Sequence, residues 1–76
     1  MVRRIFLSES DITEVNKVAM EQDRRATIQI AQDNKNISAR SLLGYYTLDY
    51  SKPMQIIVYD YDTEGIIEKF SRWFIE

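Results

Sequence analysis

Carboxylates alternate along residues 60–65, in the order Asp-Tyr-Asp-Thr-Glu-Gly. The first half of an EF-hand calcium loop has this pattern. Its twelfth position, however, would be Ser71, whereas the loop requires a glutamate that binds the ion through both oxygens. A turn with acidic N-capping residues, leading into a helix, also accounts for the run. The sequence therefore predicts no metal site.

The chain contains no histidine and no cysteine. Disulfides, thiolate ligands and every catalytic arrangement that depends on imidazole or thiol are therefore excluded. No phosphate-binding loop or dinucleotide fingerprint is present, and scattered carboxylates in so small a domain do not make a hydrolase. We expect a protein that is not an enzyme and needs no cofactor.

Charge and hydropathy limit the partners further. The 10 basic and 12 acidic residues are interleaved, and the only basic doublets are residues 3–4 and 24–25. A nucleic-acid-binding protein usually has a continuous basic stripe, so no nucleic-acid partner is expected. No apolar run approaches the length of a membrane span or a signal peptide, so we expect no membrane contact and a cytoplasmic location.

Hydrophobic patterning predicts four strands. Residues 2–7 form the first, with Ile5 and Leu7 facing inward, and residues 26–31 alternate as a second. A turn at 33–34 leads to a return strand at 37–39, and residues 54–59 form the last strand.

Three helices complete the pattern. Asp11 and Glu14 are predicted to form a capping box for a helix that ends near Gln22. Ser41 is expected to cap a short second helix over residues 42–48, and a third helix follows Asp62. The order β-α-β-β-α-β-α predicts one α+β domain over residues 1–76, a two-layer open-faced sandwich with helices on one face of a four-stranded antiparallel sheet.

The segment Ala-Arg-Ser-Leu-Leu-Gly at residues 39–44, within this element order, resembles HPr, the histidine-containing phosphocarrier of the bacterial sugar phosphotransferase system. The stretch similar to that family runs from residue 26 to 48, and the strand and helix after it extend the likeness. The resemblance implies the HPr-like fold. It also implies a regulatory phosphorylation site at Ser41, where Arg40 would tolerate the added charge.

The chain departs from that family at the phosphate-carrying site. Ser10 stands where the family has its histidine, and Ile12 and Thr13 replace the arginine and proline that follow it. A serine phosphoester is too stable to pass its phosphate on readily, and the acidic residues around Ser10 would repel an anion. A phosphocarrier that uses Ser10 or Asp11 is therefore disfavoured.

The resemblance also implies an exposed apolar surface on the second helix, where partner proteins dock. Its residues here are Leu42, Leu43 and Tyr46. We expect Leu48 and one of the two leucines to be buried, and Tyr46 and its neighbour Tyr45 to be exposed. The leading interpretation is an HPr-like adaptor or regulatory module that binds another protein and transfers no phosphate.

A different surface supports an alternative interpretation. If Ile5 and Ile56 face the helices, Phe6, Ile57 and Tyr59 face outward. With the first and last strands adjacent, as in HPr, these three would form one apolar patch on the open face. The alternative is a small structural domain that forms a weak homodimer through this patch.

Overall fold

The computed structural model describes residues 1–75 and contains one four-stranded sheet. The strand order is β1-β4-β2-β3, and each neighbouring pair is antiparallel. The strands are β1 (Val2–Ile5), β2 (Thr27–Gln32), β3 (Lys35–Ser38) and β4 (Met54–Tyr59).

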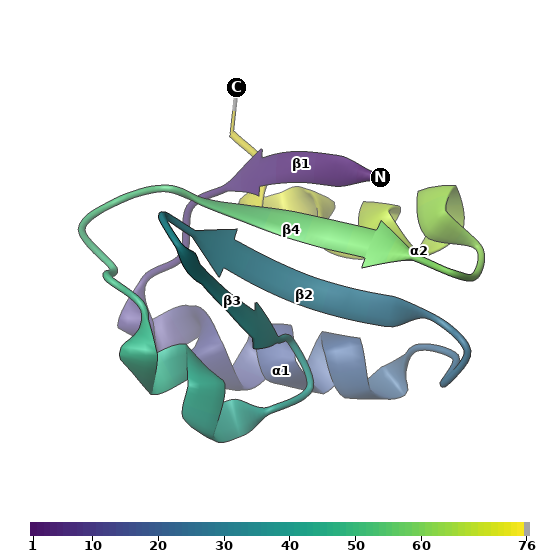
Figure 1. Ribbon diagram of the computed structural model, residues 1–76, viewed down its shortest axis with the longest axis horizontal. Coiled ribbons are helices and arrows are strands. Elements are labelled where there is room, and N and C mark those ends of the chain that lie inside the picture. Colours follow the sequence, from purple (N-terminus) through teal and green to yellow (C-terminus); the bar gives the residue numbers. More distant parts are fainter. Residues whose placement is uncertain (76) are drawn as a thin grey trace.

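The helical elements are short, apart from the first α-helix. The α-helices are α1 (Ile12–Glu21) and α2 (Thr63–Glu68), and the 3₁₀ helices are η1 (Glu9–Asp11), η2 (Leu42–Thr47) and η3 (Ser71–Trp73). Figure 1 shows α1 and α2 behind the sheet, with the opposite face of the sheet turned toward the viewer.

The core lies between the sheet and the helices. The inward residues of the strands are buried as predicted, and they share one cluster with apolar residues of α1 and α2. The buried side chains include Ile5, Leu7, Ala26, Ile28, Ile30, Ile56 and Val58 from the sheet side and Val15, Ala19, Ile66 and Ile67 from the helices. The α+β class and the open antiparallel sheet are therefore confirmed.

The start of α1 differs from the prediction. The capping box lies three residues earlier, with Ser8 as the N-cap of η1 and Asp11 as its third residue. The backbone N–H of Ser8 donates to Oδ2 of Asp11 at 2.9 Å. Asp11 therefore faces back toward Ser8, and it makes no cap hydrogen bond to α1.

The acidic run at 60–65 forms a tight turn. Asp60 and Asp62 adopt positive φ angles of 81° and 40°, and α2 begins directly after them. At Gly65, a Cβ would lie 2.6 Å from Oδ2 of Asp62, so a larger residue would not fit without a shift. Within residues 1–75, no three acidic side chains lie close enough together to hold a metal ion.

The chain end covers the outer edge of β1. The backbone N–H of Ile75 donates to the carbonyl of Arg4 at 3.0 Å, and that of Phe6 donates to Trp73 at 3.1 Å. An edge strand with unpaired backbone groups invites association with other chains, and these bonds remove part of that edge. None of the helices described is both long and apolar enough to cross a bilayer.

Candidate protein-docking surface

The predicted docking residues are all exposed on η2. Leu43 has 79% of its surface exposed, Tyr46 65% and Leu42 45%. Together these three side chains are called the η2 surface. Large apolar side chains clustered at one place on a small domain are typical of an interaction surface.

The 3₁₀ geometry of η2 accounts for which of its residues are exposed from Leu43 onward. With three residues per turn, Leu43 and Tyr46 lie on one side of η2, and Tyr45 and Leu48 lie on another. Tyr45 is fully buried and Leu48 is 8% exposed. The prediction that Tyr45 would be exposed was therefore wrong, because Tyr45 lies on the buried side of this repeat. The prediction that one leucine would be buried was also wrong: the repeat places Leu42 on the side of Tyr45 and Leu48, but Leu42 lies at the start of η2 and is 45% exposed.

Hydrogen bonds of Tyr45 anchor η2 to the domain. Its hydroxyl donates to the carbonyl of Ala39 at 2.7 Å, and its own carbonyl accepts from the hydroxyl of Tyr50 at 2.6 Å. Burial raises the pKa of the Tyr45 phenol far above its ordinary value. Gly44 sits against Ile37, where a Cβ would approach to 3.1 Å, so η2 packs closely on β3. The η2 surface therefore rests on a fixed support.

Ser41 occupies the N-cap position of η2, but its side chain makes no cap hydrogen bond. Its backbone carbonyl instead accepts from the N–H of Gly44 at 3.1 Å. The predicted position is therefore right, and the predicted capping role of the hydroxyl is wrong. The side chain is exposed.

Arg40 has a structural role that the sequence reasoning missed. Its guanidinium donates to the carbonyls of Ala19, Ala26 and Asp23 at 3.1, 2.8 and 2.9 Å, and to Gln22 at 3.4 Å. A cation at the carboxyl end of a helix satisfies carbonyls that lack helical partners and complements the helix dipole. Arg40 therefore ties the segment before η2 to the end of α1, and it does not stand ready to pair with a phosphate on Ser41.

The amino end of α1 has no anion-binding arrangement. The Ser10 hydroxyl hydrogen-bonds that of Ser8 at 2.8 Å, and the Ser8 hydroxyl donates to Asp11 at 3.0 Å. The backbone N–H of Ser8 is the main cause that lowers the pKa of Asp11. An ionised carboxylate thus accepts from the backbone N–H of Ser8, and its charge would repel a phosphate here.

The second predicted surface does not assemble as expected. The strand register places Val2 opposite Ile57, and Ile5 opposite Met54. Phe6 therefore lies beyond the end of β1, about 13 Å along the strand direction from Ile57. It is 43% exposed, but it does not join Ile57 and Tyr59 in one patch. The outward apolar residues that do lie together are Val2, Ile57 and Tyr59.

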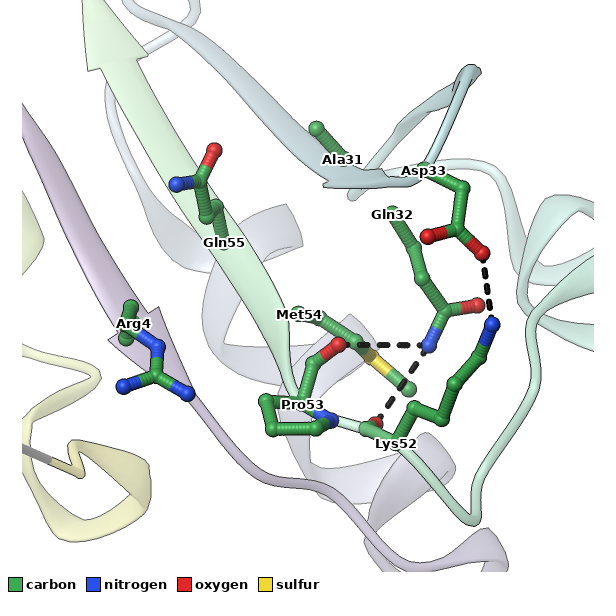
Figure 2. A pocket seen from close by; sticks show the side chains of 8 residues that line it. All are labelled: Arg4, Ala31, Gln32, Asp33, Lys52, Pro53, Met54 and Gln55. Carbon is green, nitrogen blue, oxygen red and sulfur yellow. Dashed lines mark hydrogen bonds and ion pairs between the residues drawn. The ribbon is translucent and has the colours of Figure 1, made fainter.

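A hollow of about 380 Å³ lies at the hairpin end of the sheet (Figure 2). Within it, Lys52 pairs with Asp33 at 2.7 Å, and the Gln32 amide donates to the carbonyl of Asp49 at 2.7 Å. Gln32 also accepts from the backbone N–H of Asp49 at 2.7 Å. These groups hold the loop after η2 against β2, so they have a structural role.

A second hollow, of about 460 Å³, adjoins the η2 surface. It is called the acidic hollow here, because two carboxylates line it. Its lining residues are Glu9, Tyr46, Leu48, Asp49, Tyr50 and Ser51. No sequence pattern indicated this hollow, since the loop after η2 brings residue 49 beside residue 9 only in the folded chain.

No protein-family model, curated protein or solved structure matches the chain.

Proposed function

We propose that this chain is an HPr-like adaptor or regulatory module that binds another protein through the η2 surface and transfers no phosphate. One observation carries the proposal: Leu43 and Tyr46 project from a helix that is itself anchored by the buried Tyr45. Because the backbone of η2 is already fixed, a partner that covers this pair needs to order only the two side chains.

The resemblance to HPr rests on residues 39–44 and on the arrangement of the elements. In the HPr arrangement the first and last strands are neighbours, and here β1 pairs with β4. The docking role of the helix after residue 41 is an inference from that family.

The absence of phosphotransfer follows from chemistry at the amino end of α1. The chain has no histidine, and Ser10 lies among acidic residues. We therefore infer a binding role for the fold without the carrier reaction. We also propose that Ser41 is a phosphorylation site, because its side chain is exposed and makes no cap hydrogen bond. A phosphate there would lie next to Leu42 and would alter the docking surface by its charge.

Paired substitutions test the docking role. Leu43→Glu places a charge in the centre of the η2 surface, and Tyr59→Glu places the same charge on the sheet face as the matched control. Immobilised wild-type protein and Tyr59→Glu should retain the same specific protein from an extract of the native cell, and Leu43→Glu should lose most of it. Equal retention by all three, with folding verified by circular dichroism, would contradict the assignment of the surface.

A further inference from the structure

The acidic hollow shares Tyr46 with the η2 surface, so a partner that covers Leu43 and Tyr46 also reaches the hollow. The lining includes the carboxylates of Glu9 and Asp49 and the phenol rings of Tyr46 and Tyr50. No lysine or arginine belongs to it.

Glu9 carries the uncompensated charge at this site. Its side chain is exposed, and within residues 1–75 it forms no ion pair. The effect of the Glu9 charge reaches the hollow. The pKa of the Tyr50 phenol is raised to about 12, mainly by burial and secondly by the nearby Glu9 carboxylate. A cation placed beside Tyr50 would be attracted by the same carboxylate.

Asp49 adds a second, partly offset carboxylate. Its Oδ1 accepts from the hydroxyl and the backbone N–H of Ser51 at 2.6 and 2.9 Å, which lower its pKa and keep it ionised. The ammonium of Lys52 lies 4.0 Å from Asp49 Oδ2, but it is closer to Asp33, at 2.7 Å. Lys35 also contributes to the lowered pKa of Asp49, so Asp49 is partly offset by two lysines and the negative charge left at the hollow is mainly that of Glu9.

Two carboxylates and two aromatic rings recognise a cationic side chain. Lysine and especially arginine gain from ion pairing and from contact with a ring face. An acidic side chain at this position would be repelled. A neutral apolar side chain would displace water from the carboxylates without offering them a hydrogen bond or a positive charge in return.

We propose that the partner places an arginine or lysine side chain in the acidic hollow, beside an apolar side chain that covers Leu43 and Tyr46. The proposal rests on the docking function of the η2 surface and names the chemistry of its partner.

The test uses three blocked dipeptides with ¹⁵N-labelled full-length protein. Acetyl-Leu-Arg-amide should shift the amide signals of residues 9 and 46–51 at millimolar concentrations. Acetyl-Leu-Gln-amide, which lacks the charge, should bind about three- to tenfold more weakly, and acetyl-Leu-Glu-amide more weakly still. High salt should reduce the difference between the arginine and glutamine peptides, because the carboxylates are exposed.

Two matched variants test whether the Glu9 carboxylate binds the cationic side chain. Glu9→Gln should weaken binding of the arginine peptide about threefold or more and leave that of the glutamine peptide unchanged. Glu68→Gln makes the same charge change on α2 and should have no effect. Equal binding of the arginine and glutamine peptides, equal effects of the two variants, or no shifts with any peptide would overturn the proposal. Any of these would leave the Leu43→Glu test of docking unaffected, so the two failures are distinguishable.

Discussion

Among single residues, Arg40 links the segment before η2 to the end of α1 through its guanidinium. Next to Ser41, an arginine is naturally interpreted as a partner for a phosphate. Its four carbonyl acceptors come from the end of α1 and the start of β2. No local pattern announces this contact, because the acceptors are backbone atoms 14 to 21 positions away in the chain.

Replacing Arg40 by lysine should therefore destabilise the domain. A single ammonium cannot reach all of the carbonyls that the planar guanidinium contacts, so we expect a loss of about 1–3 kcal/mol in the free energy of unfolding. Arg24→Lys, at an exposed position, is the matched control and should change stability by less than about 0.5 kcal/mol. Urea unfolding measures both, and equal stability of the two variants would show that the Arg40 contacts contribute little.

At the scale of elements, the sequence predicted strands better than helices. Strict alternation in β2 predicted which of its side chains face the core, and residues 54–59 form a strand with the predicted limits. The helical segments were harder, because apolar residues at 42, 43, 45, 46 and 48 fit either a 3.6-residue or a 3-residue repeat. In the structure this segment is a 3₁₀ helix, in which the buried Tyr45 phenol donates to the carbonyl of Ala39 and the Tyr45 carbonyl accepts from Tyr50.

Because this phenol is buried, the free energy of unfolding should vary with pH in the alkaline range. The folded state keeps Tyr45 protonated at pH values where the unfolded chain, with an ordinary phenol pKa near 10, loses the proton. The unfolded state then binds fewer protons, so the free energy of unfolding falls as pH rises above about 10, by up to about 1.4 kcal/mol per pH unit for this group.

Tyr45→Phe should cost about 0.5–1.5 kcal/mol at pH 7, where it removes the bond to Ala39. Its stability should then decline less steeply than that of the wild type between pH 10 and pH 12. Tyr59→Phe removes an exposed phenol and should keep the wild-type slope. Urea unfolding at each pH gives the slopes, and identical slopes for Tyr45→Phe and wild type would refute the coupling.

At the scale of the whole molecule, the sheet has less capacity for self-association than the sequence suggested. Phe6 lies away from Ile57, and the chain end bonds to the outer edge of β1. Long-range register cannot be read from alternation alone, because alternation fixes the face of a side chain and not its position along the neighbouring strand.

We therefore expect a monomer in sedimentation equilibrium from micromolar to millimolar concentrations. The remaining outward apolar residues on the open face, Val2, Ile57 and Tyr59, adjoin the polar side chains of Gln29 and Gln55. These polar neighbours limit the continuous apolar surface that a dimer could bury. A concentration-dependent dimer that Tyr59→Glu abolishes would instead support the alternative, a structural domain that pairs through its sheet.

Site-specific photo-cross-linking in the native cell shows directly whether another protein covers the η2 surface. A photoreactive phenylalanine analogue at Leu43, which is 79% exposed, samples whatever covers the η2 surface, and the same analogue at Tyr59 samples the sheet face. If a partner docks on the η2 surface, position 43 should give a discrete adduct with a different protein and position 59 should give none. Adducts from position 59 alone, or adducts only with a second copy of this chain, would contradict this prediction.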